Sequence, residues 1–186
     1  MLSKALLQSV LVLFLASSSN PGSTFESPDK KYYIEITDNP DSSNYTLPNC
    51  LIIHSKKVIA SLPTSGYIQD VFWSPNGKYV AINNRNAESG DYLWVISVAD
   101  GTVIKKPYDD LPTNDITERY RDFAKYNLHK QWILAIGWDH KNDLKVKRID
   151  FFDNISDYLS TDLLYTIKAN TLHLLKQLTT KLPRNN

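Results

Sequence analysis

Apolar and polar residues alternate along most of this chain, with the period of two that is typical of half-buried strands. Turn residues separate the alternating runs. The strongest turn signal is Ser74-Pro75-Asn76-Gly77, because proline presets φ and Asn-Gly tolerates positive φ. The pattern predicts strands over residues 32–37, 50–54, 57–62, 68–73, 79–83, 92–98, 102–106, 132–138 and 144–152. Short turns between successive strands favour an antiparallel meander.

Two segments change from strand spacing to helical spacing. Asp115-Ile116-Thr117-Glu118 forms a capping box, and the apolar residues after it predict a short helix over Ile116–Tyr126. Residues 154–182 carry an apolar stripe at three- and four-residue steps and predict a C-terminal amphipathic helix, which Pro183 ends. This helix has two possible partners, the β domain of its own chain or a second subunit.

The N-terminus has the three parts of a secretory signal peptide. Lys4 supplies a charge, Ala5 to Ala16 form an apolar run broken only by Gln8 and Ser9, and small polar residues follow. The run is too short for a membrane span, which needs about 20 apolar residues. We therefore expect a signal peptide over 1–19, a single β-rich domain over 20–186 and a secreted or periplasmic location. A membrane anchor or a buried N-terminal helix is the alternative, and no later segment predicts a stable membrane span.

Composition narrows the function classes. The 186 residues include 21 Lys and Arg against 20 Asp and Glu, so no excess charge points to nucleic acid or to anionic lipid. Cys50 is the only cysteine, which excludes an internal disulfide. The apolar residues that follow it predict a buried, unreactive thiol, with intermolecular pairing as the minor alternative.

An internal repeat is the most specific signal in the sequence. Ser27-Pro28-Asp29-Lys30-Lys31-Tyr32 matches Ser74-Pro75-Asn76-Gly77-Lys78-Tyr79 at a spacing of 47 residues. A third, degenerate copy aligns residues 131–135 with 78–82 and residues 144–146 with 93–95. A period of about 40 to 50 residues with several strands is typical of propeller blades.

The second copy, over about residues 68–105, resembles a blade of the WD40-like propeller repeats of TolB-type proteins. The resemblance implies that the Ser74–Gly77 turn joins two inner strands and that Asp100-Gly101 joins the outer pair. Closed propellers typically have four or more blades of about 40 residues each, and three units with two helices fill this chain. We therefore predict blade-like units in an open or sandwich-like sheet.

No catalytic constellation is recognisable, and we expect no cofactor and no bound metal. His54, His129, His140 and His173 lack the spacing of a zinc helix. Asp109-Asp110 and the series Asp150, Asp153 and Asp157 are candidate acid–base carboxylates, although solvated or capping roles are commoner. Asp139, Asn142 and Asp143 are candidate calcium ligands, but the same residue types are favoured in turns.

Aromatic residues on strands supply the candidate binding site. Trp73, Trp94 and Trp138 form the predicted binding face, although such rings also serve cross-strand packing. Alternation places Trp132, Leu134, Ile136 and Trp138 on one side of their strand. The sequence favours a non-catalytic binding or protein-interaction module whose partner is another envelope or extracellular protein. The alternative is a secreted hydrolase with an unrecognised carboxylate site.

Overall fold

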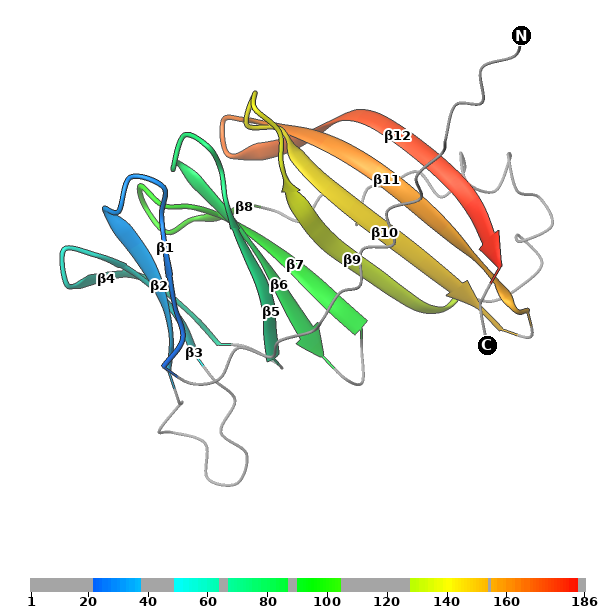
Figure 1. The fold of residues 1–186 in the computed structure, drawn as a ribbon, viewed down its shortest axis with the longest axis horizontal. Coiled ribbons are helices and arrows are strands. Elements are labelled where there is room, and N and C mark those ends of the chain that lie inside the picture. Colours follow the sequence, from blue (N-terminus) through cyan, green and yellow to red (C-terminus); the bar gives the residue numbers. More distant parts are fainter. Residues whose placement is uncertain are drawn as a thin grey trace, which may run out of the picture.

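A computed structural model describes residues 22–37, 49–63, 67–86, 90–104, 128–153 and 155–183. These residues form twelve strands in three antiparallel units of four strands (Figure 1). We call the units the first, second and third sheets. The described residues contain no helix long and apolar enough to cross a membrane.

Within each sheet the strands lie in chain order. The first sheet contains β1 (Thr24–Glu26), β2 (Tyr32–Thr37), β3 (Asn49–His54) and β4 (Lys57–Pro63). The second contains β5 (Tyr67–Trp73), β6 (Tyr79–Asn86), β7 (Gly90–Ser97) and β8 (Val103–Ile104). The third contains β9 (Leu128–Trp138), β10 (Leu144–Phe152), β11 (Asp157–Lys168) and β12 (Thr171–Pro183). One parallel pair, Asp91 with Trp132, joins β7 to β9.

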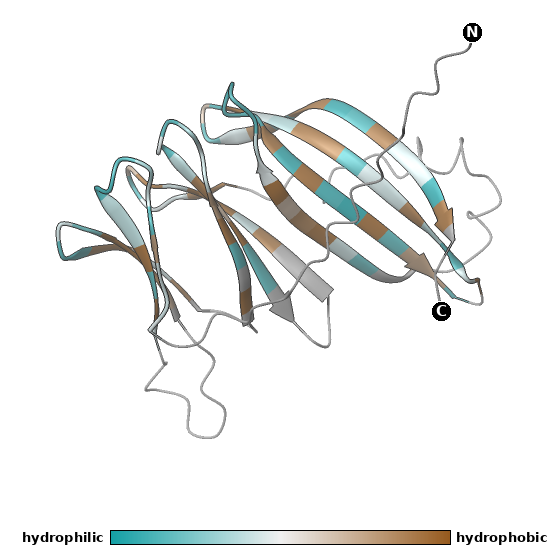
Figure 2. Ribbon diagram, viewed as in Figure 1, coloured by the Kyte–Doolittle hydropathy of each residue, from teal (hydrophilic) through white to brown (hydrophobic). Residues whose placement is uncertain are grey.

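The sheets pack face to face, and the second sheet is buried on both faces. One apolar cluster joins it to the first sheet and contains Ile34, Ile36, Cys50, Ile52, Ile68, Val80, Ile82, Ile96 and Val98. Another joins it to the third sheet and contains Ala81, Leu93, Val95, Ile104, Ile133, Ala135, Leu144, Val146, Leu163, Tyr165 and Leu172. The alternation of hydrophobic and hydrophilic residues that positions these clusters is visible along β10 and β11 (Figure 2).

The two copies of the Ser-Pro motif form the same turn. In the first sheet the Ser27 hydroxyl donates to Asp29 Oδ1 (2.8 Å) and accepts the Tyr32 N–H (3.0 Å). In the second sheet the Ser74 hydroxyl donates to Asn76 Oδ1 (2.8 Å) and accepts the Tyr79 N–H (3.0 Å). The repeat predicted from the sequence is therefore a structural repeat of the turn between first and second strands.

The third sheet has a related turn at the same topological position. The Asp139 N–H donates to the Asp143 carbonyl (2.9 Å), and Asp139 Oδ1 accepts the Lys141 and Asp143 N–H groups. Asn142 Oδ1 accepts the N–H of Asn76 in the second turn (2.9 Å). The turns that join first and second strands therefore lie at one end of the molecule, as Figure 1 shows.

The alignment of the third repeat copy was wrong by one strand. The sequence comparison matched residues 131–135 with 78–82, which lie mostly in β6, the second strand of its sheet. The structure makes β9 the first strand of the third sheet, so its counterpart by order is β5. The mismatch arose because the comparison matched apolar alternation alone, and the Ser74–Gly77 turn that precedes residues 78–82 has no counterpart in sequence before residues 131–135.

The C-terminal helix predicted over 154–182 is wrong, because most of this segment forms the hairpin β11–β12. Ala169 and Asn170 both have positive φ and make the turn between the strands. The segment pairs with β10 of its own chain, so it extends the sheet instead of covering it. The helix predicted over Ile116–Tyr126 lies outside the described residues.

Candidate protein-interaction face

The three tryptophans of the predicted binding face do not meet on one surface. Trp73 and Trp94 pack against the cluster between the first and second sheets. Trp138 packs against the other cluster, stacks on Tyr79 with centroids 6.4 Å apart, and donates its indole N–H to the Phe72 carbonyl (2.9 Å). All three rings contribute to contacts between sheets, and their role in binding stays a prediction.

A β-bulge explains why Trp138 lies on an unexpected side. The register between β9 and β10 shifts between Ala135 and Gly137, which leaves Ile136 without a cross-strand partner. A bulge adds one residue to the strand, so the alternation of sides changes beyond it. Trp138 therefore faces the second sheet, whereas Trp132 faces away from it. Gly137, whose φ is +128°, lies in this bulge, and an isolated glycine within a strand pattern is the signal by which the sequence could have predicted it.

The side of the third sheet that faces away from the second sheet is the candidate interaction face. We call it the outer face of the third sheet. Its apolar members are spread over all four strands and comprise Trp132, Leu134, Ile136, Ile149, Phe151, Tyr158, Leu164, Leu178 and Leu182. Ile136 is 38% exposed and Leu178 is 50% exposed. The other members are half-buried, so the face is partly exposed, and exposed apolar patches mark interaction sites.

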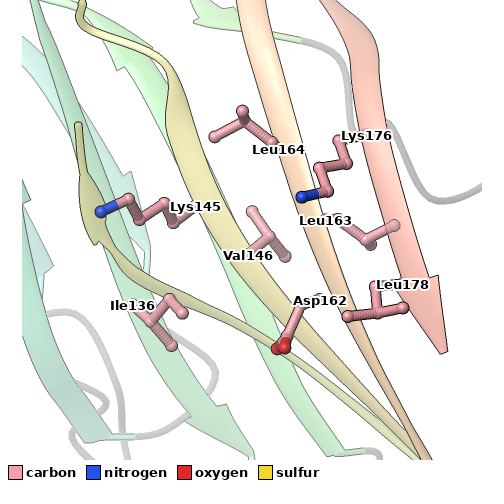
Figure 3. A pocket seen from close by; sticks show the side chains of 8 residues that line it. All are labelled: Ile136, Lys145, Val146, Asp162, Leu163, Leu164, Lys176 and Leu178. Atoms are coloured by element: carbon pink, nitrogen blue, oxygen red, sulfur yellow. The ribbon is translucent and has the colours of Figure 1, made fainter. Parts of the chain in front are cut away.

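A shallow groove runs across this outer face near the bulge (Figure 3). Its volume is about 320 Å³. Its lining comprises Ile136, Lys145, Val146, Asp162, Leu163, Leu164, Lys176 and Leu178. The groove therefore combines apolar residues with charged side chains. It is complementary to a partner surface that also contains apolar and charged groups.

Lysines dominate the charge on the outer face. Lys145 and Lys176 are exposed, while Lys147 lies 3.2 Å from Asp162 in an ion pair between neighbouring strands. Exposed pairs of this kind contribute at most about 1 kcal/mol to stability. The charges on the outer face therefore contribute little to the stability of the fold and are better suited to determining binding specificity.

An aromatic group occupies the part of the outer face nearest the start of β9. Phe151 lies between Trp132, whose ring centroid is 4.7 Å away, and Tyr158, whose ring centroid is 5.6 Å away. Edge-to-face and tilted pairs in this range of distance are favourable. Because the three rings support one another, this part of the face is preorganised.

The opposite side of the third sheet contains a buried ion pair. Arg148 Nε lies 2.8 Å from Asp150 Oδ1, and the two side chains are 6% and 1% exposed. Gln131 Nε2 donates to the same carboxylate oxygen (2.8 Å). Asp157, another member of the predicted acid–base series, lies instead 2.8 Å from Lys181. The two carboxylates thus have separate ionic partners and do not form a pair. Asp109 and Asp110 lie outside the described residues.

The candidate calcium ligands and His54 have structural contacts, and Cys50 is buried as expected. The oxygens of Asp139 and Asn142 accept backbone N–H groups within and between turns. His54 stacks on Tyr32 with centroids 4.6 Å apart. Burial raises the pKa of the Cys50 thiol to about 12. Among the residues searched, which are those the structure describes, no group of histidine, cysteine and acidic residues has the arrangement of a metal site.

Comparison with known proteins does not supply a family. No protein-family model matches the chain, and no curated protein matches it.

Proposed function

We propose that this protein is an exported, non-catalytic protein-interaction module that binds through the outer face of the third sheet. The exposed apolar groove of that face is the observation that carries the proposal. Ile136 and Leu178 leave the protein surface apolar at a place where lysines surround it. Burying such side chains in a complex lowers the free energy by about 25 cal/mol per Å² of apolar area removed from water.

The roles of the polar residues support binding rather than catalysis. The carboxylates of Asp139 and Asp150 are engaged in a turn and in a buried ion pair, and the Cys50 thiol is buried. A reaction would require a nucleophile or an acid–base pair beside a site open to substrate. The groove instead offers lysines, one aspartate that is already paired, and leucines, which is a composition suited to a protein surface.

Site-specific photo-cross-linking in the native host tests this proposal. A photoreactive amino acid at Leu178 should give a covalent adduct with another polypeptide. The matched control is Val103 on β8, which is 39% exposed but lies on the second sheet. Adducts from Leu178 and none from Val103 would support the proposal. The absence of adducts from Leu178 in the folded protein would contradict it.

The exported location has its own test. Mass spectrometry of the protein recovered from the native host should show a mature N-terminus close to residue 20. This expectation rests on the signal-like order of residues 1–19. A protein that still begins at Met1 would contradict export through a cleaved signal peptide.

A further inference from the structure

The sequence repeat identifies which face of the first sheet lacks a partner sheet. With the 47-residue spacing, Tyr33 corresponds to Val80 and Glu35 corresponds to Ile82. Val80 and Ile82 are fully buried in the contact with the first sheet. Tyr33 and Glu35 therefore lie on the face by which each sheet packs on the one before it. Among the described residues no sheet packs on that face, and Val58, whose partner Ile53 pairs with Tyr33, is 48% exposed there.

In the third sheet, the opposite face lacks a partner sheet among the described residues. The turn of the second sheet is closed by the hydrogen bond from the Ser74 N–H to the Tyr79 carbonyl, and that of the third sheet by the bond from the Asp139 N–H to the Asp143 carbonyl. Asp143 therefore corresponds to Tyr79, and Lys145, two residues on, corresponds to Ala81. Ala81 is fully buried in the contact between the second and third sheets. The outer face of the third sheet is therefore the face by which each sheet packs on the next one. The two free faces of this chain are complementary in kind.

They are also complementary in charge. The outward positions of the first sheet carry the carboxylates of Glu26 and Glu35, and its described outward residues include no lysine or arginine. The outer face of the third sheet carries Lys145, Lys147 and Lys176, with Asp162 already paired to Lys147. Opposite charge on two surfaces steers their encounter and fixes their relative position.

We propose that the outer face of the third sheet binds the free face of the first sheet of a second copy of this chain. Two copies that contact each other reciprocally make two identical interfaces and bring six sheets into one closed ring. The three sheets that the structure describes are fewer than the four or more units with which propellers typically close. This inference rests on the proposed function and names the partner of the same face.

Contacts inside the chain indicate which charged residues meet. Ile34 of the first sheet and Ile82 of the second belong to one apolar cluster. Ile34 corresponds to Ala81, and hence to Lys145, while Ile82 corresponds to Glu35. Lys145 of one copy and Glu35 of the other therefore belong to the same contact between sheets. The interface is more polar than the contacts within the chain, which is typical of assemblies whose subunits also exist separately.

Charge exchange between these two positions tests the inference. The purified protein should have twice the mass of one chain in size-exclusion chromatography with light scattering. Glu35→Lys and Lys145→Glu should each raise the dissociation constant of the dimer by about tenfold or more, because each places like charges together. The double variant, with both changes, should restore the dimer. Lys141→Glu, in an exposed turn, is the matched control and should leave the dimer unchanged.

Each other outcome has a definite meaning. A monomeric parent protein, or a dimer that is insensitive to both single changes, would overturn the inference. Particles of increasing size would also overturn it, because a head-to-tail contact that does not close builds filaments. Cross-links from Leu178 to a different protein, together with a monomeric parent, would overturn the dimer while retaining the proposed function. Thermal unfolding of each variant shows whether it is folded.

Discussion

Replacing Gly101 with alanine should destabilise the protein more than the same change at Gly77. Both glycines have positive φ, at +72° and +66°. Their surroundings differ, because a Cβ added at Gly101 would lie 2.9 Å from Ala60 Cβ and 2.9 Å from the Ile59 carbonyl oxygen. A Cβ added at Gly77 would lie no closer than 3.8 Å to the Asp29 side chain.

The expected magnitudes follow from these distances. Alanine in the left-handed region costs about 1–2 kcal/mol at either position. At Gly101 overpacking adds about 1–3 kcal/mol, because the neighbours of the new methyl group include the backbone of β4. For a domain of this size each 1 kcal/mol lowers the melting temperature by about 2–4 °C. The gain from restricting the unfolded chain is common to both variants, so it cancels in the comparison.

Thermal and urea unfolding of the parent and the two variants measure this difference. Gly77→Ala reports the backbone conformation alone, and Gly101→Ala reports conformation plus contact between the first and second sheets. Equal losses of stability in the two variants would show that the turn after β7 does not press against β4. The close approach of Gly101 to β4 would then be wrong.

Three further outcomes are expected from the described residues. Arg148→Met should lower the free energy of unfolding by about 3–5 kcal/mol, because it leaves the Asp150 carboxylate buried without its cation. The double variant Arg148→Met with Asp150→Leu should recover part of that loss, and full stability of the single variant would contradict the buried pair. The Cys50 thiol, whose pKa burial raises to about 12, should react with a thiol reagent at pH 8 only after unfolding, and rapid labelling of the native protein would contradict its burial. The pKa of Asp29 is lowered mainly by the hydrogen bond from Ser27, and that of Asp139 mainly by the hydrogen bond from the Asp143 N–H. A carboxylate whose pKa is depressed in the folded protein contributes stability above the ordinary value of 3.8, and this contribution is lost as the pH falls below it. Asp29→Asn should therefore reduce the loss of stability during acid titration, and an unchanged titration would contradict this role.

Strands bounded by clear turns were predictable from the sequence. The alternation in residues 32–37 matches β2, and the Ser74–Gly77 signal lies between β5 and β6 as expected. These elements depend on local information, namely period-two alternation and proline, asparagine or glycine at the turn. A sequence alone therefore supports the mainly β architecture and the repeated units.

The C-terminal hairpin was not predictable by the same reasoning, because two periods coexist in its residues. Leu164, Ile167, Leu174 and Leu178 fall at helical steps, but Leu159, Thr161, Leu163 and Tyr165 alternate along the buried side of β11. A register shift beside Leu164 disturbs the alternation, and the turn at Ala169 and Asn170 lacks glycine. Tertiary pairing with β10 decided the conformation.

The candidate face depended on the bulge at Ile136, for which the isolated Gly137 is a local signal that simple alternation ignores. Simple alternation placed Trp132 and Trp138 on the same side of β9, and the bulge separates them. The sequence supplied the aromatic residues, but only the register of β9 against β10 shows which of them face away from the second sheet.

The burial of both faces of the second sheet has a consequence for folding cooperativity. The first and third sheets each bury their apolar face against the second sheet. Their strands are consecutive in the chain, so each sheet has mainly local contacts, but neither outer sheet has a dry core until the second sheet is formed. In a linear array of this kind stability is transmitted through nearest neighbours. Defects in the second sheet should therefore unfold the whole chain, whereas defects in either outer sheet can fray that end first.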